Sequence, residues 1–282
     1  MPTFATPEPV TLRLRVQSGE ILVEASDRAD TKVEVRPYNS NKPADSEAAQ
    51  QTLVEQRDGS IVVETPDGKE IGRFGRSGAV YVRVALPTGS HLRGTKASAD
   101  LRGVGRLGDV DLNTASGDVE LQEVGELEVQ TASGDVTCRR VDGSAKVQSA
   151  SGDVTLGEVG GDLQVASASG DLDLGPVGGD VRVQTASGDT TVAVAGGSVE
   201  ARSASGDVSL PSVRRGQVSV ETASGDVTVG IAAGVAAWLD VSSLSGDVHS
   251  SLDDSGEPGE GDESVELRAR TLSGDVSIVR AR

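Results

Sequence analysis

The chain has 282 residues and a formal net charge of −18, and aromatic residues make up only 2% of it. The negative charge argues against nucleic acid as a partner and against direct membrane insertion or binding to an anionic membrane surface. The scarcity of aromatic side chains argues against a globular enzyme built around a large ligand pocket. Any core must therefore consist mainly of Val, Leu and Ala.

Residues 10–36 contain three runs in which apolar and polar side chains alternate, which indicates strands with one buried face. Residues 43–53 interrupt this pattern with good helix formers and predict a short helix. Strands resume at 61–63 and at 80–84, on either side of a Gly-rich loop that carries Arg73, Phe74 and Arg76. We interpret residues 1–95 as irregular N-terminal capping coils with loop insertions, and these three side chains as candidates for interaction.

A repeat of about 18 residues dominates the rest of the chain. Each unit contains two nine-residue halves, and each half places apolar residues at alternate positions after a turn rich in Gly and Asp. Ser-Gly-Asp recurs with its serine at positions 116, 133, 151, 169, 187, 205, 224, 245 and 273. Such short strands are stable only when each copy pairs with the equivalent residues of the next copy.

Alignment of the units gives columns that are almost entirely aliphatic. One column contains Val154, Leu172, Thr190, Val208 and Val227, and it continues with Val248 and Val276. This arrangement predicts an all-β fold, a single-stranded parallel β-solenoid (β-helix) with about ten coils over residues 96–282. We expect right-handed coiling, because parallel crossover connections have that hand.

The Ser-Gly-Asp turns also produce a column of carboxylates. Because stacked carboxylates repel one another, we expect each Asp to accept backbone N–H groups of its own turn. A calcium-binding β-roll is the alternative, although the Gly spacing differs from that of such rolls. The residues of this alternative metal ladder are Asp135, Asp153, Asp171, Asp189 and Asp207. We expect no resident metal and no cofactor.

Two late coils carry insertions, one before Trp238 and an acidic one at residues 253–264. The sequence ends soon after Ile278, with no helix to cover the last coil. We expect the insertion with Trp238 to contact a partner protein. We also expect an uncapped C-terminal coil, at which Ile278 contacts another protein or a second copy stacked end to end.

Candidate catalytic residues are few. His91 and His249 are the two histidines, and neither lies in a nucleophile or metal motif. The single cysteine, Cys138, occupies an aliphatic column and is expected to be a small buried hydrophobe. These observations predict a protein that is not an enzyme. With no signal peptide and no long apolar run in this chain, we expect a cytoplasmic location.

The opening, and especially ASDRADTKVEVRP at residues 25–37, followed by many [TS]-[AL]-S-G-D-[VL] coils, resembles the bacterial β-strand-repeat family of unknown function named "putative adhesin". The resemblance covers nearly the whole chain. It implies a toast-rack-like β-solenoid without established catalysis, and for some members an association with envelope stress. It provides no functional residue to transfer. The sequence thus predicts a non-enzymatic scaffold or protein-interaction rod.

Overall fold

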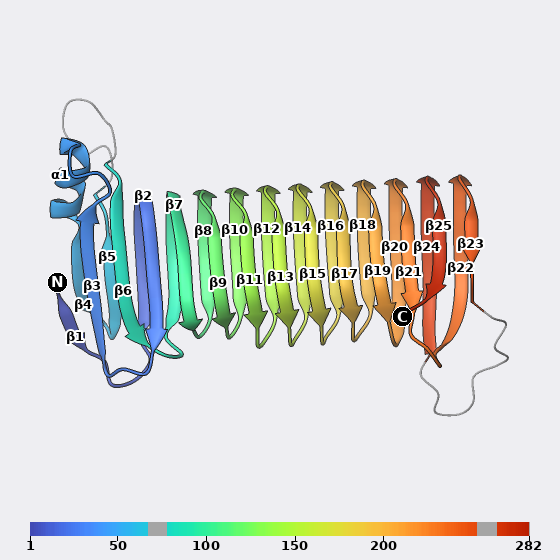
Figure 1. The fold of residues 1–282 in the computed structure, drawn as a ribbon, viewed down its shortest axis with the longest axis horizontal. Helices are drawn as coiled ribbons and strands as arrows, with labels where there is room; N and C mark the ends of the chain where they lie inside the picture. The colour runs from blue at the N-terminus through green and yellow to red at the C-terminus, as the bar shows by residue number, and fades with distance from the viewer. Residues whose placement is uncertain (67–77, 253–263, 282) are drawn as a thin grey trace. The chain divides into compact units, whose positions relative to one another are not determined.

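A computed structural model describes residues 1–66, 78–252 and 264–281 of the chain. The described residues form strands and one helix, and the strands pair mostly in parallel, which confirms the β-solenoid (Figure 1). The chain divides into two compact units, residues 1–140 and 141–282, which are described separately here.

The first unit begins with irregular elements and continues into regular coils. Its elements are β1 (Thr3–Ala5), β2 (Thr11–Ser26), β3 (Asp30–Pro37), α1 (Pro43–Gln51), β4 (Leu53–Arg57), β5 (Ser60–Glu64), β6 (Val80–Pro87), β7 (His91–Arg106), β8 (Val110–Ser116), β9 (Val119–Val124), β10 (Leu127–Ser133) and β11 (Val136–Val141).

Strand β2 lies inside the first unit although it comes early in the sequence. Its first half pairs in parallel with β5 on one side and β7 on the other, and its second half lies between β6 and β7. Gly19, with a φ of 127°, marks the bend between the halves, where a Cβ would lie 1.8 Å from the Val80 carbonyl oxygen. The coil β5–β6, which comes later in the sequence than β2, therefore lies outside β2.

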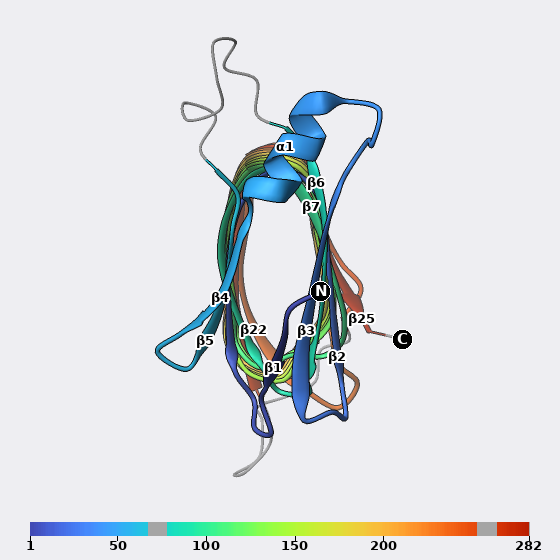
Figure 2. The same ribbon diagram turned by 90° about the vertical axis from the view of Figure 1, so that its left-hand side faces the viewer.

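Antiparallel strands and the helix cover this outer coil. Strand β4 pairs with β5, β3 pairs with β6, and β1 pairs with β3. The predicted helix is confirmed as α1, which packs on β3 and β6. Figure 2 shows α1 crossing the oval outline of the coils at one end of this unit. The unit thus has a capped end, as expected for a solenoid whose edge would otherwise be open.

The second unit consists of coils made of two short strands each. Its strands are β12 (Ala145–Ser151), β13 (Val154–Val159), β14 (Leu163–Ser169), β15 (Leu172–Val177), β16 (Val181–Ser187), β17 (Thr190–Ala195), β18 (Val199–Ser205), β19 (Val208–Val213), β20 (Gly216–Ser224), β21 (Val227–Ile231), β22 (Ala236–Ser245), β23 (Val248–Ser250), β24 (Ser264–Ser273) and β25 (Val276–Arg280).

The predicted columns are confirmed by the strand register. Val154 pairs with Leu172, Leu172 with Thr190, and Thr190 with Val208. These side chains are buried in the interior of the coils, where equivalent aliphatic groups pack on one another. The interior contains no aromatic side chain among the described residues of the second unit, as the composition predicts.

The last coils of the second unit do not follow the order of the sequence. Strand β24 pairs with β20 on one side and with β22 on the other, and β25 lies likewise between β21 and β23. The coil β22–β23 is therefore the outermost one, and the chain returns to place β24–β25 inside it (Figure 1). Ile278 in β25 is fully buried, so our expectation that it lies at the open end was wrong.

Candidate interaction surface

Of the residues with catalytic potential, His91 has a structural partner, Cys138 is buried and His249 is exposed on β23. The backbone N–H of Asp109 donates to Nδ1 of His91 at 2.9 Å, which ties two neighbouring turns together. Cys138 is buried, and burial raises the pKa of its thiol to about 11. Such a thiol is a poor nucleophile. Within residues 1–66, 78–252 and 264–281, no group of three or more His, Cys, Asp or Glu side chains is arranged to hold a metal ion.

The carboxylates of the Ser-Gly-Asp turns connect successive coils. The backbone N–H of Asp171 donates to Oδ1 of Asp153 at 2.8 Å, and that of Asp189 to Oδ1 of Asp171 at 2.9 Å. The acceptor therefore serves the next coil and not its own turn, contrary to our expectation. A carboxylate that accepts a backbone N–H is stabilised in its charged form without a cation. The ladder thus has a structural explanation.

A column of hydroxyl groups lies on the inner side of the same corner. Ser149, Ser167 and Thr185 are buried, and each donates its hydroxyl to a backbone carbonyl two residues later at 3.0–3.2 Å. In the first unit Lys96 takes the equivalent position, in register with Thr114. Its ammonium group donates to the carbonyl oxygens of Ala99, Gly117 and Asp118. Burial lowers the pKa of Lys96 to about 8. These groups support the corner from inside.

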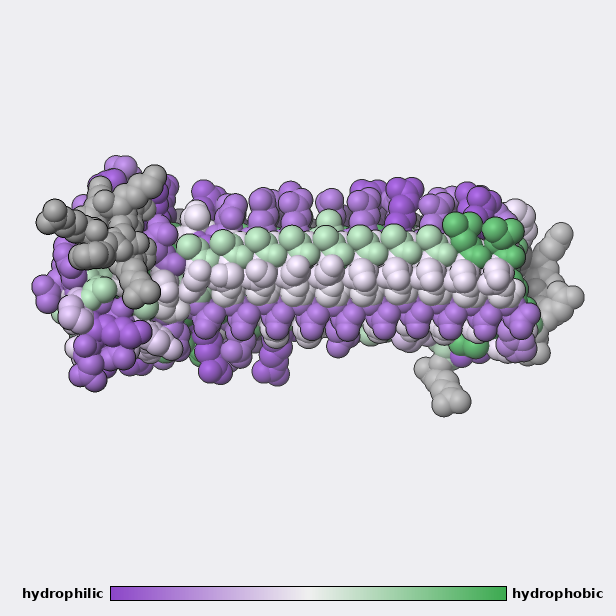
Figure 3. Space-filling model, turned by 90° about the horizontal axis from the view of Figure 1, so that it is seen from above, coloured by the Kyte–Doolittle hydropathy of each residue, from purple (hydrophilic) through white to green (hydrophobic). Residues whose placement is uncertain are grey.

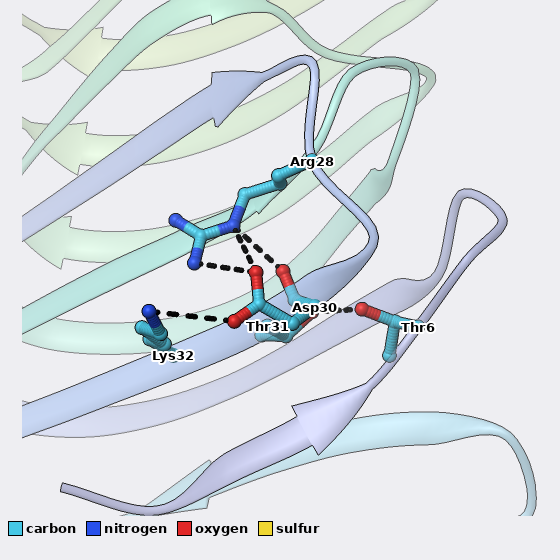
Figure 4. A network of polar contacts seen from close by, with 5 residues as sticks. All are labelled: Thr6, Arg28, Asp30, Thr31 and Lys32. Atoms are coloured by element: carbon cyan, nitrogen blue, oxygen red, sulfur yellow. Dashed lines mark hydrogen bonds and ion pairs between the residues drawn. The ribbon is translucent and has the colours of Figure 1, made fainter.

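The motif at residues 25–37 has a structural role in the first unit. Figure 4 shows the Arg28 guanidinium bound to Asp30, with Nη2 2.7 Å from Oδ1, and Lys32 3.5 Å from the other carboxylate oxygen. The hydrogen bond from Arg28 lowers the pKa of Asp30. Thr31 and Thr6 share a buried hydroxyl–hydroxyl bond of 2.9 Å, which joins β3 to the segment after β1. The motif therefore fastens the capping strands.

The candidate interaction residues lie in different places. Arg73, Phe74 and Arg76 fall outside the described residues. Trp238, by contrast, lies on the outermost coil of the second unit with 68% of its surface exposed. The pattern at this end is unusual, because no large apolar side chain is exposed on the strands of the second unit that precede β22.

Three further side chains at this end were not identified from the sequence. Leu244 is 81% exposed and Leu272 is 58% exposed, and both replace the alanine of the preceding coils at the corner. The corner residues of successive coils form a row on the surface. Figure 3 shows this row in pale green along the coils and in the dark green of strongly hydrophobic residues at its end. Val248 is half-exposed at a position that is buried in the inner coils. For Leu244 and Leu272, the change from Ala to Leu in the repeat was the sequence feature that could have identified them. We call Trp238, Leu244, Val248 and Leu272 the apolar end patch.

The inserted turn before Trp238 is fixed to the inner coil. Arg280 in β25 donates through Nη1 to the carbonyl oxygens of Ala232 and Val235, at 3.2 and 2.9 Å. Arg280 thus closes a turn and holds the start of β22 in place. Trp238 is consequently presented on a fixed strand, with its backbone paired to that of Glu266.

Comparison with known proteins supports the fold. A model of the Toastrack DUF4097 family matches residues 11–279. A structure from Parabacteroides distasonis, described as a "putative lipid binding protein", is 12% identical, covers 99% of this chain and 96% of its own, and has a TM-score of 0.43. A "putative adhesin" from Bacteroides fragilis is 17% identical, with 99% and 95% covered and a TM-score of 0.32. No curated protein matches the chain significantly.

The described parts of the chain contain no helix with the length and hydrophobicity needed to cross a membrane.

Proposed function

Because the chain belongs to the Toastrack DUF4097 family, whose name assigns it no activity, we propose its function from its surface: it is a non-enzymatic scaffold that binds a protein partner. The observation that carries the proposal is the apolar end patch. Its four large side chains are exposed on two adjacent coils of the second unit. Large apolar side chains that are exposed at one end of a surface otherwise without them indicate an interaction site.

The rest of the described surface of this unit favours the same location. Outward side chains on the inner coils are mostly polar or small, and some form ion pairs between adjacent strands, such as Arg182 of β16 with Glu200 of β18 at 2.9 Å. Exposed ion pairs of this kind contribute little to binding energy, because water screens them. A large aromatic side chain such as Trp238 contributes far more when it is desolvated at an interface. We therefore place the contact at the end patch.

The proposal is tested by photocrosslinking in the cells that produce the protein. A photoreactive phenylalanine derivative replaces Trp238 in the full chain, and a matched control carries it at Tyr38, which is 60% exposed in the first unit. We expect a protein adduct, identified by mass spectrometry, from position 238 only. No adduct from position 238, or equal adducts from both positions, would contradict the proposal.

The cytoplasm is the compartment we propose for this function, and the single cysteine, buried and without a disulfide, is compatible with a reducing environment. Cell fractionation tests this location. Recovery of the protein outside the cytoplasm would overturn it while leaving the binding role open.

A further inference from the structure

The outer edge of β22 has the properties of a pairing surface. The strand is ten residues long and pairs with β24 along one side. Among residues 141–252 and 264–281, no strand pairs with its other side. Natural edge strands are usually protected by Lys, Pro, bulges or a covering element. Strand β22 contains neither Lys nor Pro, and its sequence is AAWLDVSSLS.

The capped end of the first unit provides a comparison within the same chain. There α1 packs on β3 and β6, and the added strand β4 carries the charged residues Glu55 and Arg57. Pro2, Pro7 and Pro9 flank β1. The chain thus protects one edge with a helix, an added charged strand and prolines, whereas β22 has no covering element and only one charged residue, Asp240.

The interior of the coil is also accessible at β22. Leu239 and Val241 point inward and are half-exposed, whereas their neighbours in β24, Leu267 and Ala269, are fully buried. A surface with the same outline as the coil would cover these positions. The end of a second copy has that outline.

The two large exposed side chains of β22, Trp238 and Leu244, lie three residues on either side of Val241. In an antiparallel pair of β22 strands related by a two-fold axis, residues whose numbers add to a constant stand opposite each other. With the axis at Val241, Trp238 of one copy stands opposite the partner's Leu244, and Asp240 stands opposite the partner's Ser242. Directly opposed residues are close enough for their side chains to contact each other. An axis at Asp240 would instead oppose two carboxylates, which is unfavourable.

We propose that two copies of this chain form a closed dimer by antiparallel pairing of their β22 edges about Val241. The alternative arrangement, β22 against the partner's β23, is less favourable because β23 has only three residues. An isologous contact of this kind uses the same surface twice and therefore closes as a dimer. This inference names the partner for the end patch, and so it rests on the proposed function.

Charge at this end permits the contact despite the net charge of −18. The one ionisable side chain of β22 is Asp240, and its Oδ2 lies 3.3 Å from Arg268 Nε and 3.4 Å from Arg270 Nη2. These two arginines of the same chain offset its charge. The carboxylate on the open edge is therefore offset within its own chain, which reduces its repulsion of a second copy.

Light scattering after size exclusion tests the dimer with the full chain over a range of concentrations. We expect the wild type to reach twice the monomer mass of 28.7 kDa, and Trp238→Lys and Leu244→Lys to remain monomeric at concentrations at least tenfold higher. Leu53→Lys is the matched control, because Leu53 is an exposed leucine on β4 of the first unit, outside the apolar end patch. Circular dichroism confirms that each variant is folded. A monomeric wild type, polymers, or a dimer that both Lys variants retain would overturn the proposal.

Cysteine crosslinking tests the register. Trp238→Cys and Leu244→Cys proteins, mixed under oxidising conditions, should give a crosslinked heterodimer, whereas each alone should give much less. Val241→Cys alone should crosslink efficiently, and Leu53→Cys and the wild type, with its buried Cys138, should not. Equal crosslinking of all variants would overturn the register. A wild-type monomer whose position 238 still crosslinks another protein would remove the dimer and leave the scaffold function standing.

Discussion

The backbone N–H of Asp247 donates to Oδ1 of Asp275 at 2.8 Å, although Asp275 comes 28 residues later in the chain. In the inner coils the direction is the opposite, since the N–H of Asp207 donates to the earlier Asp189. Asp275 in turn donates its N–H to Oδ1 of Asp226. The ladder therefore follows the order of the coils in space. The bond from Asp247 to Asp275 exists because the chain returns to place β24–β25 inside β22–β23, which leaves β22 at the edge.

The return of the chain predicts different costs for the same substitution at two positions of one column. Val276→Asp places a charge in a fully buried site and should lower the free energy of unfolding by more than about 3 kcal/mol. Val248→Asp, at a half-exposed site, should cost less than about 1 kcal/mol. Urea denaturation of both variants measures the difference. The reverse ranking would mean that the coils follow the order of the sequence.

The Asp ladder predicts a stabilising role for individual carboxylates. Asp189→Ala removes the acceptor of the Asp207 N–H and should lower the free energy of unfolding by about 1 kcal/mol. Asp189→Asn retains an acceptor oxygen and should cost less. Asp173→Ala, at an exposed strand position, is the control and should change stability by less than about 0.5 kcal/mol. Equal losses for Asp189→Ala and Asp173→Ala would contradict this role.

Because the ladder carboxylates bind backbone N–H groups, calcium should not stabilise the fold. We expect the melting temperature of the full chain to be the same in millimolar calcium and in chelator. Magnesium is the control for general ionic effects. A calcium-specific increase of several degrees would instead favour the β-roll alternative, since a ligand that binds only the folded state raises its stability.

The glycine of the Ser-Gly-Asp turn should tolerate no side chain. Gly206 has a φ of 128°, and a Cβ there would lie 2.2 Å from the Gly188 carbonyl oxygen. Gly206→Ala should therefore destabilise the fold by about 2–4 kcal/mol through backbone strain and this clash. Gly59→Ala has the strain of a positive φ but open space around the added methyl group, so it should cost only about 1 kcal/mol. Thermal denaturation distinguishes them, and equal costs would refute the clash.

Lys96 predicts a pH dependence of stability. Its pKa is about 8 in the folded chain, against an ordinary value of 10.5. Between these values the unfolded chain binds a proton that the folded chain does not, so raising the pH favours the folded state. The contribution of Lys96 should increase from pH 8 to pH 10.5 by about 1–3 kcal/mol.

Urea denaturation of the wild type and of Lys96→Met across this range isolates the effect. As the pH rises, the free energy of unfolding of the wild type should increase relative to that of Lys96→Met. A constant difference would show that the Lys96 pKa is not lowered in the folded chain.

The regular coils could be predicted from the sequence because their evidence is repeated many times. The column that contains Val154, Leu172 and Val208 is aliphatic at every copy except Thr190, and only stacked coils bury these side chains together. The short helix α1 was predictable for a different reason, because good helix formers interrupt the alternating pattern there.

The arrangement of the ends could not be predicted in this way. Val248 and Val276 satisfy the same column in either order, so the pattern contains no information on which one is outermost. The interaction surface depends on this order, because it decides whether Ile278 or Val241 lies next to the edge. The sequence also could not predict that each Asp accepts a hydrogen bond from the next coil. That bond depends on the distance between coils and not on the sequence of one turn.

The most direct test of the account is amide hydrogen exchange of the peptide covering residues 236–245, in the concentrated wild type and in Trp238→Lys. If β22 is the contact edge, its amides should exchange more slowly in the wild type, and the protection should disappear on dilution. The peptide covering β16 serves as an internal reference. Identical exchange of residues 236–245 in both proteins at all concentrations would contradict the claim that this edge binds a second copy.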